Sequence, residues 1–223
     1  QPWSTFVMTS QLPSPILEKM IKITDEIIEN KESAIRYNEE TLAGQIEDEF
    51  IIELEILERE ELMDFFLNVC KTYVVHAQCQ ALPSQKEEMV NEEWLAQLTS
   101  MWMVSQKDNE YNPIHIHSNC HLSCVMYLKI PEFLPSRKSN GEDGSIIFTN
   151  NASTDKIWAG SILQILPHVG DFFIFPSTQH HQVYPFRTAD GKGERRSVSF
   201  NAQFTSKSEQ DFIKKQQDYQ ETI

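Results

Sequence analysis

The N-terminal third of the chain carries apolar residues at helical spacing. Between Ser14 and Asn30, aliphatic side chains recur every three to four residues, which is typical of an amphipathic helix. Ser14 offers an N-cap and Pro15 suits a first turn, so we expect the helix to begin there. A second apolar-periodic segment extends from about Leu57 to Gln80, after an acidic stretch that favours a helix N-terminus. The pattern therefore predicts two N-terminal helices.

Beyond about residue 100, helical spacing gives way to short β-prone runs separated by turn residues. Eight of these runs are candidate strands: Met101 to Lys107, Pro113 to Ser118, Leu122 to Ile130, Ser145 to Asn150, Ile162 to Leu166, Asp171 to Phe175, Gln182 to Phe186 and Arg195 to Phe204. Eight short strands suggest a sandwich, a jelly roll or a small barrel, and the helices would then buttress one face.

The length of 223 residues allows one domain or a small pair. Because the helices need an apolar partner and the strands supply one, we expect a single domain over residues 1–223. Its parts would be a mainly helical support region over 1–98, a jelly-roll core over 99–205 and a C-terminal helix or tail over 206–223. The expected fold class is mainly β with flanking helices.

Charge and hydropathy exclude several classes of protein. The chain has 33 acidic and 19 basic residues, a net charge of −14, which disfavours binding to a phosphate backbone. Its longest apolar runs are far shorter than the roughly 20 residues that cross a bilayer, so we expect no membrane span. The first residues lack the basic and apolar regions of a secretory signal, which favours the cytoplasm. The pattern does not indicate an oligomeric state.

The four cysteines form no Cys-x-x-Cys pair, and we expect free thiols. Cys120 and Cys124 flank His121 in a segment that could be mistaken for a metal knuckle. If that segment is a strand, its rise of about 3.3 Å per residue holds the two cysteines roughly 13 Å apart. That separation suits neither a disulfide nor a shared zinc ion.

Three of the seven histidines lie in the segment NPIHIHSNCH. On a strand, His115 and His117 project from one face, so that their imidazoles can converge on one ion. Ile114 and Ile116 would project from the other face and enter the core. From this spacing alone, two surface or core histidines without a ligand are an equally good interpretation.

A second cluster follows an apolar strand, in the segment GDFFIFPSTQHHQVYP. A jelly roll brings distant strands together, so a histidine 64 residues after His117 can supply a third ligand. Neighbours on an extended chain point to opposite sides, and therefore only one of His180 and His181 is expected to bind the metal. The other would be a solvated loop histidine.

The start of the last strand, RRSVSFN, alternates between polar and apolar positions. One face would carry Arg195, Ser197, Ser199 and Asn201, and the other Val198 and Phe200. An arginine with a hydroxyl two residues further on is suited to binding a carboxylate. The alternative is an exposed edge strand with a solvated basic face.

Taken in order, these segments resemble one family. They are His115-x-His117, LSxVxYL from Leu122 to Leu128, GSIIF, PxxGDxxxFPS, HxVxP and RxSxxFN, spread over Trp102 to Phe204. The set resembles the 2-oxoglutarate/Fe(II)-dependent oxygenases of prolyl-4-hydroxylase-like layout. The resemblance implies a double-stranded β-helix, or jelly roll, with flanking helices.

The resemblance also implies roles for individual residues. His115 resembles the first iron ligand and His181 the distal ligand, while His117 stands where the family usually has a carboxylate. Arg195 and Ser197 match the pair that holds the distal carboxylate of 2-oxoglutarate. The remaining implied pocket residues are Tyr127, which resembles a strand tyrosine that helps the same carboxylate but suits a core aromatic nearly as well, and Ser123, Asn201 and Trp102.

The activity implied is that of a hydroxylase using Fe(II), 2-oxoglutarate and O2, in which decarboxylation to succinate is coupled to hydroxylation of a C–H bond. The sequence does not distinguish a small-molecule substrate from a protein side chain. No catalytic residue is implied beyond the metal ligands.

The histidine at position 117 departs from the family pattern of two histidines and one carboxylate. A neutral imidazole leaves the iron more positive than a carboxylate does, and all-histidine iron sites can activate oxygen without 2-oxoglutarate. Neither Asp171 nor Glu142 has a spacing that would make it a substitute ligand.

Two other interpretations remain open at this point. A cupin-like metalloprotein that does not use 2-oxoglutarate is compatible with His-x-His followed by G-x5-P-x4-H, but it has no need for the arginine at position 195. A non-catalytic jelly-roll binding protein is motivated by the substituted third ligand.

Overall fold

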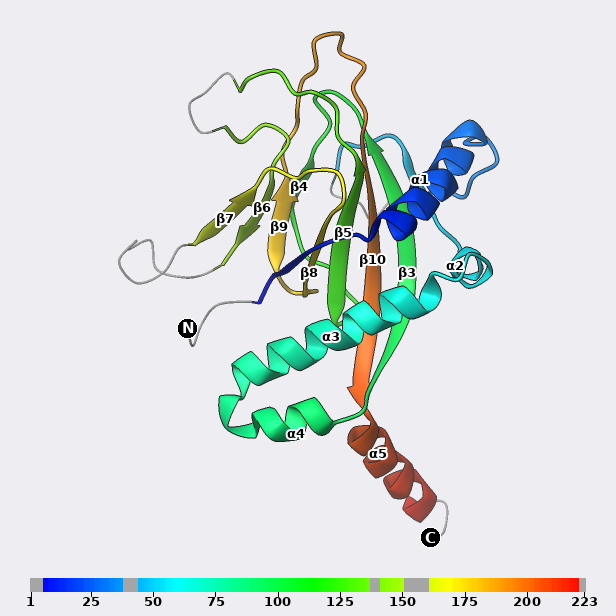
Figure 1. Ribbon diagram of the computed structural model, residues 1–223, viewed down its shortest axis with the longest axis vertical. Coiled ribbons are helices and arrows are strands. Elements are labelled where there is room, and N and C mark those ends of the chain that lie inside the picture. Colours follow the sequence, from blue (N-terminus) through cyan, green and yellow to red (C-terminus); the bar gives the residue numbers. More distant parts are fainter. Residues whose placement is uncertain (1–5, 38–43, 137–140, 151–160, 221–223) are drawn as a thin grey trace.

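The computed structural model describes residues 6–37, 44–136, 141–150 and 161–220. Its strands form two antiparallel sheets (Figure 1), in the orders β1-β8-β5-β10-β3-β2 and β4-β9-β6-β7. The strands are β1 (Met8–Gln11), β2 (Glu49–Ile51), β3 (Trp94–Gln106), β4 (Asn112–His115), β5 (Leu122–Lys129), β6 (Ile146–Thr149), β7 (Ile162–Ile165), β8 (Asp171–Pro176), β9 (His180–Val183) and β10 (Arg195–Ser206). The predicted mainly β jelly roll is confirmed.

The six-stranded sheet is buried on both faces. Along β5, Cys124, Met126 and Leu128 point into the core that the helices cover, while Val125 and Tyr127 point toward the four-stranded sheet. Burial on both sides explains why this strand is a continuous apolar run rather than an alternating one. The space between the two sheets holds the smaller of the two cores, and the candidate site shares it.

Helices α1 (Ser14–Glu29) and α3 (Met63–Ala81) lie on the outer face of the six-stranded sheet (Figure 1). The other helices are α2 (Leu54–Arg59), the 3-10 turn η2 (Pro83–Gln85), α4 (Lys86–Asn91) and α5 (Lys207–Gln220), which extends away from the sheets. None of the described helices is long and apolar enough to cross a membrane.

The single helix expected from Leu57 to Gln80 is two helices, α2 and α3. Glu61 between them has a φ of 57°, in the left-handed region, so the helix cannot continue through it. Apolar spacing persists across the break because Leu57 and Leu62 enter the same core. The periodicity therefore predicted correctly which residues are buried, but it did not predict the turn at Glu61.

Ile114 and Ile116 do not enter the core as expected. They are 53% and 47% exposed, because they lie on the outer face of the four-stranded sheet. The six-stranded sheet has helices over its outer face, whereas the described residues include no helix packed on the four-stranded sheet. Strand alternation was therefore correct, but the side opposite the histidines faces outward.

An ionic cluster around the buried Arg196 ties α1 to the six-stranded sheet. Arg196 is 2% exposed, and its Nε and Nη2 donate to the carboxylate of Glu194 at 2.8 and 2.9 Å. Its Nη1 donates to Asp25 at 2.6 Å, and Lys129 Nζ donates to the same carboxylate at 2.5 Å. Hydrogen bonding to Lys129, then to Arg196, lowers the pKa of Asp25.

All four cysteines are free thiols, as expected.

Candidate active site

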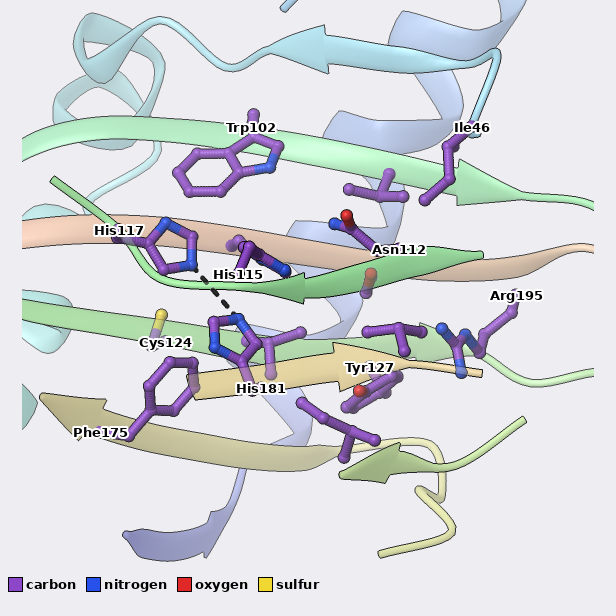
Figure 2. Close-up of a pocket in the computed structure, with 16 residues that line it drawn as sticks. Ile46, Trp102, Asn112, His115, His117, Cys124, Tyr127, Phe175, His181 and Arg195 are labelled. Atoms are coloured by element: carbon purple, nitrogen blue, oxygen red, sulfur yellow. Dashed lines mark hydrogen bonds between the residues drawn. The ribbon is translucent and has the colours of Figure 1, made fainter. Parts of the chain in front are cut away.

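Three histidines from two strands and a loop converge between the sheets (Figure 2). The ligand nitrogens of His115, His117 and His181 all lie within 4.8 Å of one another, and His117 Nε2 is 3.3 Å from His181 Nε2. Two nitrogens bound at right angles, each about 2.1 Å from one ion, lie about 3.0 Å apart. The spacing therefore suits adjacent ligands on one face of a metal ion.

Strand pairing brings the first and last histidine together. β4 and β9 are antiparallel neighbours, and His115 and His181 are directly paired in register, with ring centroids 4.2 Å apart. His117 follows the end of β4, where its backbone N–H donates to Ser177 O at 2.9 Å. This bond fixes the position of His117 without a strand. His180 is exposed on the opposite face of β9.

Backbone carbonyls orient two of the imidazoles. His115 Nδ1 lies 2.7 Å from Pro113 O, and His181 Nδ1 lies 2.9 Å from Gln179 O. A carbonyl only accepts, so each Nδ1 carries the proton, and each Nε2 keeps a free lone pair. Metal-bound histidines are usually held by a hydrogen bond of this kind from the other ring nitrogen.

The surroundings keep all three imidazoles neutral. Burial lowers the pKa of His115 and His181, and burial together with the neighbouring His115 lowers the pKa of His117 to about 4. Aromatic rings form the walls: Phe175 lies 4.7 Å from His181 and Trp102 lies 5.8 Å from His117, between ring centroids. Neutral imidazole is the metal-binding form, so these residues fit a metal ion.

The same pocket extends to an arginine. Figure 2 shows the histidines at one end and Arg195 with Tyr127 at the other, and Ser197 also lines the pocket. β10 lies between β5 and β3, so Arg195 is only 2% exposed, and the alternative of a solvated basic edge strand is wrong. Burial lowers the pKa of Arg195.

The partners of Arg195 are neutral. Its Nη1 donates to Gly144 O at 2.6 Å, its Nη2 donates to the side-chain oxygen of Gln106, and its guanidinium lies 5.7 Å from the Tyr127 ring centroid. Among the described residues no carboxylate pairs with it. A buried cation without an anion is costly unless a ligand supplies one.

Four buried polar atoms lack a hydrogen-bond partner within the described chain. They are Ser123 Oγ, Tyr127 Oη, Arg195 Nε and Asn201 Oδ1. Tyr127 and Arg195 line the pocket, so a carboxylate there would satisfy both. Burial raises the pKa of Tyr127 to about 12, which keeps its hydroxyl able to donate. These residues fit a ligand carboxylate.

Ser123 and Asn201 are paired in register on β5 and β10. Along the ladder of β5 and β10, this pair is two residues further on than the pair of Val125 and Ser199, which lines the pocket. Neither Ser123 nor Asn201 lines the pocket. Trp102 does line it. Sequence analysis did not identify Gln106 or Gly144 as partners of Arg195, because no motif links either residue to Arg195. Gln106 is found only through its pairing with Arg195 across the strands, and Gly144 through its hydrogen bond to Arg195.

Fold and site together form a jelly roll in which a cluster of three histidines, able to hold a metal ion, lies beside a buried arginine. Residues 100–201 match the family model described as "Putative 2OG-Fe(II) oxygenase". This segment holds every residue of the site named above, and its match agrees with the family resemblance that the order of the motifs indicated. No curated protein sequence matches the chain.

Solved structures share the fold at low sequence identity. A prolyl-4-hydroxylase from Pseudomonas putida has a TM-score of 0.52 at 15% identity, covering 90% of this chain and 94% of that chain. A prolyl hydroxylase from Trichoplax adhaerens, in complex with a hypoxia inducible factor peptide fragment, has a TM-score of 0.53 at 13% identity, covering 89% and 84%. In both cases the likeness in fold therefore extends beyond residues 100–201.

Proposed function

We propose that this chain couples the oxidative decarboxylation of 2-oxoglutarate to hydroxylation of a substrate C–H bond. The observation that carries the proposal is one pocket with three convergent neutral imidazoles at one end and, at the other, a buried arginine that has no carboxylate partner among the described residues. A 2-oxo acid with a second, distal carboxylate has the two ends that such a pocket requires.

Each end of the pocket has its own task. His115, His117 and His181 would hold Fe(II), which when bound supplies the activation of O2. Arg195, Tyr127 and Ser197 would hold the distal carboxylate, which orients the 2-oxo acid toward the histidines. Phe175, together with the other aromatic walls, excludes water and so favours these polar contacts.

Two general features of the chain complete the proposal. We propose that it works as one domain, because α1 and α3 share a core with the strands that carry the site. The substrate is proposed to be a small molecule or a protein side chain. The Trichoplax adhaerens structure holds a peptide fragment, which supports the second class.

Anaerobic titration of metal-free protein with Fe(II) and then 2-oxoglutarate tests the proposal. We expect a visible charge-transfer band that saturates at one equivalent of the 2-oxo acid. In His181→Ala, Fe(II) affinity should fall by more than about 100-fold, because a ligand is lost. The matched control is His180→Ala, whose imidazole is exposed and outside the cluster. Full iron occupancy in His181→Ala contradicts the ligand assignment.

A cupin-like metalloprotein is the second candidate, and the absence of a carboxylate from the cluster of three histidines favours it. The same titration separates the two. If Fe(II) binds stoichiometrically and 2-oxoglutarate produces no band, the three-histidine centre serves chemistry without the 2-oxo acid.

A further inference from the structure

Gln106 is the closest side-chain partner of Arg195 and has no role in the function described so far. It is the last residue of β3, is 1% exposed, and is paired in register with Arg195 on β10. Its side-chain oxygen accepts a hydrogen bond from Arg195 Nη2. Arg195 is thereby held from the side of β3 and, through Gly144 O, from the loop before β6.

The chain also fixes the orientation of the Gln106 amide. Its Nε2 donates to Glu110 O at 2.5 Å and faces Tyr184 O at 3.4 Å. Because both partners are carbonyl oxygens, the amide nitrogen must face them and the amide oxygen must face Arg195. A glutamate at this position would place a carboxylate oxygen against those two carbonyls.

The side-chain carboxylate of Glu110, near Gln106, is hydrogen-bonded to other groups. Glu110 accepts from the backbone N–H of Glu47 at 3.1 Å and of Lys107 at 2.7 Å. Gln106 therefore supplies an acceptor of the length of glutamate without its charge, and the positive charge of Arg195 is not neutralised within the described chain.

We propose that Gln106 is a positioning residue that anchors Arg195 while leaving its charge available, so that the pocket selects 2-oxo acids with a second carboxylate. The inference rests on the proposed function, because it concerns the same pocket. It assigns selectivity among 2-oxo acids to a neutral residue that does not itself contact the metal ligands.

Gln106→Glu tests the inference through two probes, 2-oxoglutarate and pyruvate, each titrated anaerobically into the Fe(II) protein. The new carboxylate would pair with Arg195 and compete with the distal carboxylate of 2-oxoglutarate. We expect 2-oxoglutarate affinity to fall about 10- to 100-fold. Pyruvate has no distal carboxylate, so its affinity should change less than about twofold.

Two further variants and two checks of folding keep the test decisive. Gln97→Glu adds the same charge at an exposed position of β3 and should leave both affinities unchanged. Gln106→Met removes the anchor without adding charge and should lower 2-oxoglutarate affinity by a smaller factor, again sparing pyruvate; it decides the matter if Gln106→Glu does not fold. Melting temperature and Fe(II) stoichiometry report folding.

The outcomes separate the inference from the function beneath it. Unchanged 2-oxoglutarate affinity in Gln106→Glu overturns the inference, as does an equal loss for both probes, which would indicate general damage to the site. If the unmodified protein binds Fe(II) but neither 2-oxo acid, the proposed function itself fails.

Discussion

Arg195 and Arg196 are neighbours at the start of β10, equally buried, and opposite in their surroundings. Arg196 points toward α1 and contacts two carboxylates of the chain, those of Glu194 and Asp25. Arg195 points between the sheets and contacts a carbonyl, an amide and an aromatic ring. Within the described part of the chain, Arg196 has carboxylate partners and Arg195 has none.

The difference teaches how to tell a structural arginine from a binding one. Burying a guanidinium costs several kcal/mol, and only hydrogen-bonded opposite charge offsets much of that cost. For Arg196 the offset is present in the folded chain, so its contacts stabilise the fold. For Arg195 the described residues provide no such charge, which supports its proposed role in binding a ligand carboxylate.

The largest effect should come from breaking the paired arginine. Arg196→Ala leaves Glu194 without its guanidinium and separates α1 from β10, which should cost about 3 kcal/mol of unfolding free energy. Partial exposure of Asp25 keeps the value at the lower end of the range for buried pairs. Denaturant unfolding measures it. A loss below about 1 kcal/mol would mean that the cluster does not hold α1.

The unpaired arginine should behave in the opposite way. In Arg195→Met, unfolding free energy without ligand should change by less than about 1 kcal/mol or rise, because an uncompensated buried charge is removed. Affinity for 2-oxoglutarate should fall about 100-fold while Fe(II) still binds. Calorimetric titration and the charge-transfer band report the two properties separately. A destabilisation equal to that of Arg196→Ala would abolish the contrast.

The smallest effect concerns pH. The pKa of Asp25 is lowered by its bonds to Lys129 and Arg196, and the pKa of Glu194 is lowered by its bonds to Arg196 and Ser105 against opposing burial. A carboxyl group whose pKa is lower in the folded state than in the unfolded state stabilises the fold at any pH above its unfolded pKa of about 4. This stabilisation is lost as the pH falls through the folded pKa. Melting temperature should therefore drop by a few degrees more between pH 5 and pH 3 in the unmodified protein than in Arg196→Ala. Parallel curves would exclude the cluster as the source.

Local pattern accounts for most of what the sequence could predict. Alternation along β10 placed Arg195 and Ser197 on the face opposite Val198 and Phe200. Two-residue spacing correctly predicted that His115 and His117 converge, but His117 lies beyond the end of β4 and not on the expected strand. Those rules need only the period of a strand. Eight of the described strands overlap the β-prone runs between turn residues that were expected. β3 begins at Trp94, seven residues before Met101, and β9 covers His180–Val183 and not Gln182 to Phe186.

The features that were missed depend on partners distant in sequence. The contact between Gln106 and Arg195 joins positions 89 residues apart, and it follows from the register of β3 against β10. Exposure of Ile114 depends on which sheet the helices cover. β1 and β2 are three or four residues long and form by adding to the edges of an existing sheet. Periodicity carries none of this information.

The two ends of the pocket belong to different layers of the fold. His115 and His181 are carried by the four-stranded sheet, whereas Arg195 and Tyr127 are carried by the six-stranded one. A 2-oxo acid held by the histidines at one end and by Arg195 at the other would therefore connect the two sheets. Binding of such a ligand would restrain the separation of the two sheets.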